Sequence, residues 1–111
     1  EESKRGTWVI WLVFASLLAP FLEEIFFRGF IYPVLKKYWG MMPAMIITSV
    51  FFASLHFSYS AFLIIFILGI VLTCLYEKTG SLWASVIFHS FNNFMATLVV
   101  VYVIPEGSLG S

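Results

Sequence analysis

The sequence has few charged residues and a single cysteine. Only 11% of its 111 residues are charged, whereas soluble domains carry about 25%. This scarcity excludes an ordinary soluble domain, and a formal net charge of zero gives no support to a nucleic-acid partner. Cys74 stands alone, which excludes an internal disulfide. Hydrophobic residues make up 61% of the chain and include 13 Phe and 4 Trp, so we predict an integral membrane protein in contact with lipid.

Four apolar segments follow one another along the chain, at residues 7–38, 43–56, 61–76 and 82–104. As a continuous helix the first would be about 48 Å long, more than the roughly 30 Å hydrocarbon core of a bilayer. Pro20 therefore predicts either a bent helix or two helical pieces. Gly69, in the third segment, is predicted to mark a close helix contact. The predicted fold class is all-α, with about four transmembrane helices around a buried polar cavity.

The predicted domain organisation is a single membrane-embedded core at residues 7–104. Residues 105–111 are rich in Gly and Ser and are interpreted as a flexible tail or a non-native remnant. Lys36, Lys37 and Lys78 fall in the connections on one side of the membrane. By the positive-inside rule, that side is the cytoplasmic one.

An acidic motif interrupts the first apolar segment. Glu23, Glu24 and Arg28 place three formal charges within six residues. Charges inside a bilayer cost roughly 2.5–3.5 kcal/mol each on insertion scales, so they must pair, face water or take part in chemistry. Residues four apart share a helix face, so Arg28 pairs most easily with Glu24. Glu23 is then left without a local cation, which suits a general acid or base.

Three further polar residues lie in the later apolar segments. His56 ends the second segment one helical turn after Phe52, and His89 and Asn93 are four apart on the last. A His and a Glu can polarise one water molecule between them. A His and an Asn on one helix face can present two donors to a developing oxyanion. The chain therefore contains the groups needed for attack of water on a carbonyl.

Other interpretations of these residues remain open. The charges can form a buried ion-pair network that ties helices together, and a membrane His is often only a helix–helix hydrogen bond. A metal site would need Glu23, His56 and His89 to converge, although the sequence has no His-Glu-x-x-His pair. None of the serines lies in a Gly-x-Ser-x-Gly turn, so a serine nucleophile is disfavoured.

The order of these motifs resembles one known family. Glu23-Glu24-x-x-x-Arg28, then Phe52-x-x-x-His56, then His89-x-x-x-Asn93 is similar to the CPBP family of type II CAAX prenyl proteases and bacteriocin-processing (Abi) membrane proteins. The resemblance covers about residues 18–96. Each motif alone is weak, but all three in this order and at helical spacing are specific.

The resemblance implies an intramembrane glutamic endopeptidase that needs no metal or other cofactor. It implies that Glu23 and His56 activate water, that His89 and Asn93 stabilise the tetrahedral intermediate, and that Glu24 and Arg28 order the site. The implied substrate is a peptide leader or a membrane protein, and the implied location is a bacterial inner or plasma membrane. The alternatives are a non-catalytic immunity or scaffold protein of the same fold, a metal-dependent membrane protease, or an ion pathway.

Overall fold

The protein is an all-α bundle, and the computed structural model describes residues 2–103. In chain order its elements are α1 (Glu2–Val13), η1 (Phe14–Leu18), α2 (Ala19–Phe26), η2 (Phe27–Ile31), α3 (Tyr32–Trp39), α4 (Met41–Ser54), α5 (Phe62–Thr79) and α6 (Leu82–Val103). The elements η1 and η2 are single π-helical turns. Residues 2–103 contain helices and no strand, which confirms the predicted fold class. The predicted tail, 105–111, and residue 104 lie outside the described residues.

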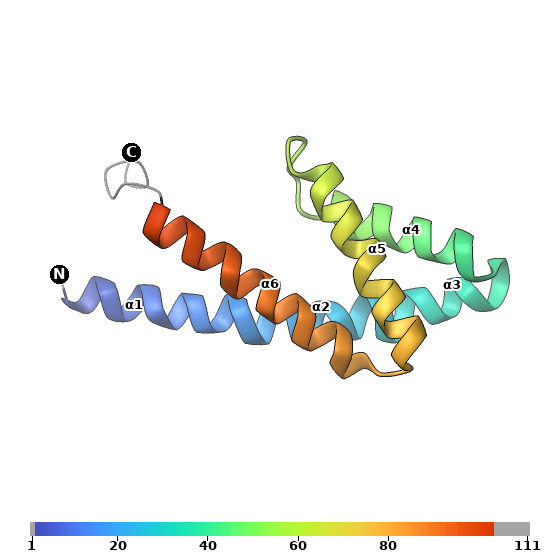
Figure 1. Cartoon of the computed structure of the whole chain (residues 1–111), viewed down its shortest axis with the longest axis horizontal. Helices are drawn as coiled ribbons and strands as arrows, with labels where there is room; N and C mark the ends of the chain where they lie inside the picture. The colour runs from blue at the N-terminus through green and yellow to red at the C-terminus, as the bar shows by residue number, and fades with distance from the viewer. Residues whose placement is uncertain (1, 104–111) are drawn as a thin grey trace.

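The elements α1 to α3 form one uninterrupted helix, drawn from blue to cyan in Figure 1. Of the two forms predicted for this segment, the pair of separate helical pieces is wrong. A proline has no N–H to donate, and its ring crowds the carbonyl four residues earlier. A wider turn precedes each proline: the N–H of Ala19, next to Pro20, donates to Phe14 five residues earlier, and that of Tyr32, next to Pro33, donates to Phe27. The π-turns thus accommodate both prolines within a continuous helix.

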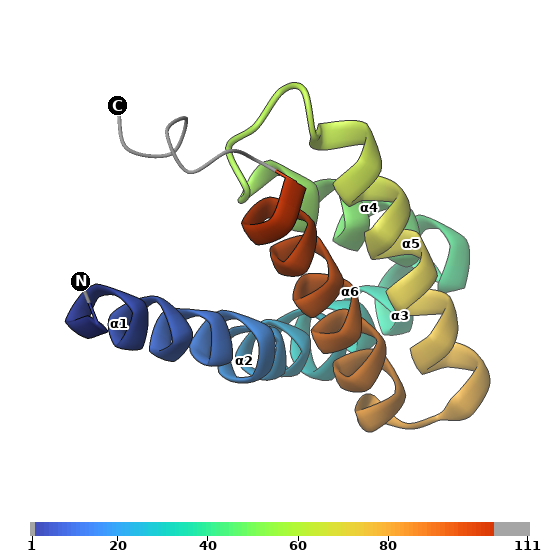
Figure 2. The ribbon, with the colours of Figure 1, turned by 60° about the vertical axis from the view of Figure 1, so that its left-hand side comes forward.

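The other three helices pack against this long helix between η1 and α3. The hairpin of α4 and α5 lies against α3 and η2, while α6 runs beside α2 and contacts α5 (Figures 1 and 2). Two apolar clusters form the core, one of Phe27, Phe52 and Leu72, the other of Tyr32, Ala44 and Met45. Both clusters lie between the long helix and the hairpin of α4 and α5. The buried apolar core is therefore on the side of the bundle that contains η2, α3 and this hairpin.

Within residues 2–103, two helices are long and apolar enough to cross a bilayer, at Gly6–Trp39 and Phe62–Thr79. A third apolar helix, Met41–Ser54, is shorter. Large apolar side chains are exposed along the helices, among them Trp11, Leu63 and Ile87. Contiguous exposed apolar surface of this kind fits contact with lipid rather than water. The number of four membrane spans stays a prediction.

Candidate active site

The two glutamates of the acidic motif lie on α2, Arg28 lies in the second π-turn η2, and Glu24 is fully buried. The Arg28 guanidinium donates from Nη1 to Oε1 of Glu24 at 3.2 Å, and both side chains are 0% exposed. The pair predicted from the spacing of four is therefore confirmed. A buried charge is stable only when it is paired and hydrogen-bonded, so each of these two ions depends on the other.

Arg28 also reaches across to α5, a contact that the sequence did not reveal. Its Nη2 donates to the carbonyl of Gly69 at 2.9 Å, and its Nε donates to the Thr73 hydroxyl at 3.4 Å. The Thr73 hydroxyl donates in turn to the same carbonyl at 2.8 Å. The guanidinium carbon lies 4.6 Å from the centre of the Phe52 ring, within cation–π range. Arg28 thereby joins the long helix to both helices of the hairpin.

Gly69 lies at a close contact between α5 and α4, as the sequence predicted. A Cβ atom at this position would come within 3.1 Å of the Ser49 Cβ and 3.2 Å of the Phe52 Cδ1. These distances are shorter than ordinary van der Waals contact, so only glycine fits without movement of α4. The absence of a side chain also leaves room beside the carbonyl that accepts the Arg28 hydrogen bond.

Gly69→Ala is expected to destabilise the bundle by about 1–3 kcal/mol, because the added methyl group overpacks the crossing of α4 and α5. Gly29→Ala is a matched control, since a Cβ there meets nothing nearer than 3.9 Å. In both variants alanine improves intrinsic helix propensity by about 1 kcal/mol. Thermal unfolding in detergent, followed by circular dichroism, compares the two, and equal melting temperatures would contradict a close contact at Gly69.

His89, on α6, lies between the two glutamates. Its Nδ1 is 2.8 Å from Oε1 of Glu24, and its Nε2 is 3.5 Å from Oε2 of Glu23. An ionised carboxylate only accepts hydrogen bonds, so Nδ1–H donates to Glu24 and Nε2 is the nitrogen that faces Glu23. The His89 side chain is 2% exposed, whereas the Glu23 side chain is 36% exposed. Glu23 is therefore the member of this cluster that external molecules can reach.

His56 is an exposed residue in the turn that follows α4, and its environment differs from that of His89. Its Nδ1 is 2.8 Å from the carbonyl oxygen of Phe52. A carbonyl only accepts, so Nδ1 carries a proton, and in the neutral ring the lone pair is on Nε2. The Phe52 ring packs against both imidazoles, with centroids 4.9 Å from His56 and 5.7 Å from His89. Within residues 2–103, the imidazole in contact with Glu23 is that of His89 and not that of His56.

Asn93 follows His89 by one turn of α6, on the face that the spacing predicted. Its Nδ2 donates to the carbonyl of Ala15, in the first π-turn, at 3.4 Å. The amide thus ties α6 to the long helix at a point two turns before the acidic motif. The bond is long, so it is a weak one that a competing acceptor can replace.

Two carboxylate oxygens in this cluster are buried without a hydrogen-bond donor among the described residues. They are Oε2 of Glu23 and Oε2 of Glu24. Buried polar atoms nearly always have partners, so these oxygens mark where a water molecule or a substrate N–H can bind. Over residues 2–103 no group of three His, Cys, Asp or Glu side chains is arranged to hold a metal ion.

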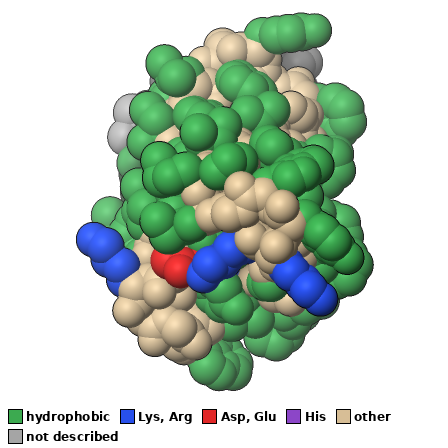
Figure 3. Space-filling view, turned by 90° about the vertical axis from the view of Figure 1, so that its right-hand side faces the viewer, with side chains coloured by type: hydrophobic (Ala, Val, Ile, Leu, Met, Phe, Trp, Pro, Cys, Tyr) green, Lys and Arg blue, Asp and Glu red, His purple; other side chains and the backbone are tan. Residues whose placement is uncertain are grey.

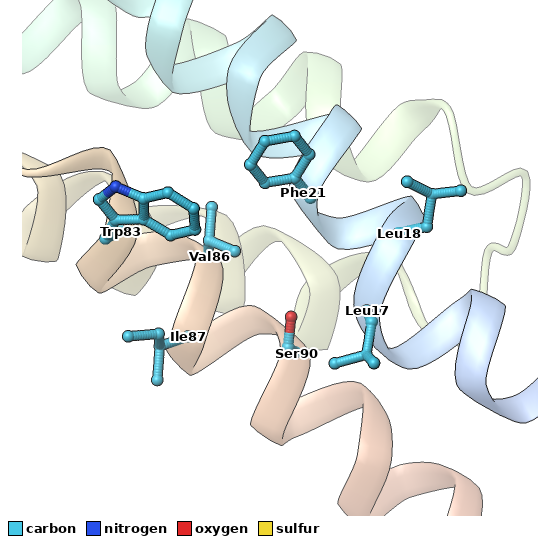
Figure 4. Close-up of a pocket in the computed structure, with 7 residues that line it drawn as sticks. All are labelled: Leu17, Leu18, Phe21, Trp83, Val86, Ile87 and Ser90. Carbon is cyan, nitrogen blue, oxygen red and sulfur yellow. The ribbon is translucent and has the colours of Figure 1, made fainter.

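An apolar cavity of about 470 Å³ lies between the long helix and α6. Figure 4 shows its lining, which comprises Leu17, Leu18, Phe21, Trp83, Val86, Ile87 and Ser90. None of the six candidate site residues lines it. This cavity is suited to apolar contacts, and the predicted polar catalytic cavity stays a prediction.

Fold and site together define a helical membrane protein with a buried Glu–Arg–His cluster at its centre. Residues 5–95 match the family described as type II CAAX prenyl endopeptidase Rce1-like, and the chain belongs to this family. The resemblance deduced from the three motifs is thereby confirmed.

Two curated relatives come from Bacillus subtilis (strain 168). "Putative membrane peptidase YdiL" is 30% identical over 90 residues, which cover 81% of this chain and 36% of the relative. "Uncharacterized protein YpbD" is 35% identical over 82 residues, which cover 70% of this chain and 39% of the relative. The chain thus spans less than two fifths of the length of either relative. No solved structure matches it.

Proposed function

We propose that the chain forms the core of an intramembrane endopeptidase that hydrolyses a peptide bond with glutamate-activated water. The observation that carries this proposal is the bracketing of His89 by two carboxylates inside an apolar bundle. One carboxylate, Glu24, is paired with Arg28, and the other, Glu23, belongs to a side chain that is 36% exposed. Membership of an endopeptidase family supports the same reaction class.

In the proposed reaction, Glu23 acts as the general base. Its carboxylate takes a proton from a water molecule while the water oxygen forms a bond to the carbonyl carbon of the substrate. The carbonyl π electrons move to the oxygen and give a tetrahedral oxyanion. When this intermediate collapses, the C–N bond breaks and the proton held by Glu23 passes to the leaving nitrogen. The products are one carboxylic acid, which then loses its proton to water, and one amine.

The remaining polar residues have supporting roles in this proposal. His56 helps Glu23 to activate the water through Nε2, because its Nδ1 is already bonded to the Phe52 carbonyl. His89 and Asn93 stabilise the oxyanion. Donation from Nε2 of His89 requires a ring that carries both protons, since Nδ1–H is used on Glu24. Glu24 and Arg28 hold the His89 ring in place.

The proposed substrate is a membrane-associated peptide or a membrane protein, cleaved where the chain enters the bilayer. A bacterial inner or plasma membrane is the proposed location, since both curated relatives are bacterial. Family membership makes a prenylated peptide a substrate that must be included in any assay.

The proposal is tested with purified protein in liposomes and a panel of membrane-anchored, leader-type and prenylated peptides. Cleavage, measured by mass spectrometry of the products, is expected for at least one peptide class and is expected to survive a strong chelator. Cleavage that the chelator abolishes would instead favour the metal-dependent alternative. Absence of cleavage on every peptide would favour a non-catalytic scaffold, for which the Arg28 network already offers a purely structural role.

His56→Gln is expected to lower the cleavage rate about a hundredfold, because general-base assistance contributes about 10²–10⁴-fold. Its melting temperature is expected to stay close to that of the wild type, since His56 is an exposed residue in the turn after α4 and its side-chain hydrogen bond is to the carbonyl of Phe52, four residues earlier. Asn92→Ala serves as the control, because Asn92 is exposed and points away from the His89 face of α6. An unchanged rate in His56→Gln would remove His56 from the proposed mechanism.

A further inference from the structure

A cationic notch lies at the end of the bundle where α3 and α5 both terminate. Its volume is about 370 Å³, and its lining comprises Tyr32, Pro33, Lys36, Lys37, Tyr76 and Glu77. Figure 3 views the molecule from this end and shows Lys and Arg side chains around one acidic patch, on a face that is otherwise largely apolar. None of the proposed catalytic residues lines the notch, so its chemistry needs a separate explanation.

The single acid of the notch is already neutralised. The Tyr32 hydroxyl donates to Oε2 of Glu77 at 2.6 Å, and the Lys36 ammonium pairs with Oε1 of the same carboxylate. The adjacent Lys37 is exposed, and among the described residues no carboxylate forms an ion pair with it. Its ammonium lies 6.0 Å from the Tyr38 ring. The notch therefore carries a net positive charge and presents N–H donors from two neighbouring lysines.

The notch lies at the ends of both candidate membrane spans, a position that would bring it close to lipid headgroups. Both candidate membrane spans end beside it, one at Trp39 and the other at Thr79. Tyr38 and Trp39 are exposed there, and such aromatic rings are typical of the membrane–water interface.

An apolar track leads from the notch along the outside of the long helix. Phe30 is 62% exposed and Val34 is 42% exposed. They precede Lys37 by seven and three residues, a spacing that places all three close to one helix face. A ligand with both an anionic head and a long apolar tail would contact the lysines and this track together.

We propose that the notch binds the headgroup of an anionic phospholipid. The phosphate accepts hydrogen bonds from Lys36 and Lys37, and one acyl chain lies over Val34 and Phe30. Charge-assisted hydrogen bonds to phosphate account for the preference over zwitterionic lipid, whose own ammonium is repelled by the lysines. The apolar track favours a lipid over free phosphate, because free phosphate has no acyl chain to contact Val34 and Phe30.

The test measures lipid binding by native mass spectrometry of the detergent-purified chain, with phosphatidylglycerol or phosphatidylcholine of the same acyl composition. Wild-type protein is expected to bind phosphatidylglycerol more tightly. Lys37→Gln is expected to raise its Kd about fivefold, the equivalent of roughly 1 kcal/mol per interfacial lysine. Lys78→Gln is the matched control, because it removes the same charge from the same end but does not line the notch. Its Kd is expected to change less than twofold.

Three outcomes would overturn the proposal. Equal losses in Lys37→Gln and Lys78→Gln would mean diffuse attraction by surface charge, and equal binding of the two lipids would mean no headgroup recognition. Displacement of bound lipid by millimolar inorganic phosphate would assign the notch to a soluble anion. Both lysines are exposed, so the two variants are expected to have the melting temperature of the wild type. A melting curve of each variant checks that a change in Kd reflects binding and not loss of the fold.

Discussion

Glu23→Gln is expected to slow peptide hydrolysis about a thousandfold without loss of the fold. Glutamine keeps the shape of the side chain but cannot take a proton from water, and general-base catalysis contributes about 10²–10⁴-fold. The fold is expected to survive because Glu23 is partly exposed and contacts His89 only at 3.5 Å. The measurement is the initial rate on the best peptide of the panel, together with a melting curve in the same detergent.

The neighbouring variant Glu24→Gln provides the matched comparison. The chemical change is identical, but Glu24 is fully buried and holds both Arg28 and His89. We therefore expect Glu24→Gln to lower the melting temperature as well as the rate, since it leaves the Arg28 charge without its counterion. Wild-type activity in Glu23→Gln would show that Glu23 is not the base, whatever the behaviour of Glu24→Gln.

Arg28→Ala is expected to destabilise the protein by about 3–5 kcal/mol, the range seen when one partner of a buried ion pair is removed. The substitution leaves the buried Glu24 carboxylate without its cationic partner, and it also removes the hydrogen bonds to Gly69 and Thr73 on α5. Asn93→Ala is expected to have a much smaller effect, because it loses one hydrogen bond of 3.4 Å. Chemical or thermal unfolding of the two detergent-solubilised variants makes the comparison, and similar losses would contradict the central role of the Arg28 pair.

A double variant separates the two causes of the Arg28 effect. In Glu24→Gln/Arg28→Met both charges are absent, so no ion is left unpaired in the core. We expect this variant to be more stable than Arg28→Ala, although it still lacks the hydrogen bonds to α5. If it were no more stable, the bonds to Gly69 and Thr73 would be the main contribution of Arg28, and the ion pair a minor one.

Features that depend on spacing within one helix were predictable from the sequence. The Glu24–Arg28 pair follows from a separation of four residues, and the helix bounds follow from apolar runs interrupted by Gly and polar turns. At Gly80, for example, a φ of +65° ends α5 in the left-handed conformation that glycine tolerates best. Gly69 was recognisable because a lone glycine in an apolar helix is typical of a close crossing.

Two kinds of feature were not predictable: wider turns within a helix, and contacts between helices. The π-turns before Pro20 and Pro33 were missed because a proline in a helix is compatible with a kink, a break or a wider turn. The bonds from Arg28 to Thr73 and Gly69 depend on the placement of α5, which no local pattern encodes. The same holds for His89: its contact with both glutamates arises from the packing of α6 on α2, and the spacing gave no reason to prefer it to His56 beside Glu23. The catalytic roles themselves stay predictions.

The long sequence separations within the Arg28 network have a consequence for synthesis of the protein. Arg28 and Glu24 meet within four residues, but the Gly69 carbonyl is 41 residues further along the chain and His89 lies 65 residues after Glu24. At the usual 5–20 residues per second, the ribosome needs about 2–13 s to supply these partners. During that interval the first helix enters the membrane with a charge pair that is only half satisfied. We therefore expect this helix to stay sheltered from lipid until α5 and α6 have been synthesised.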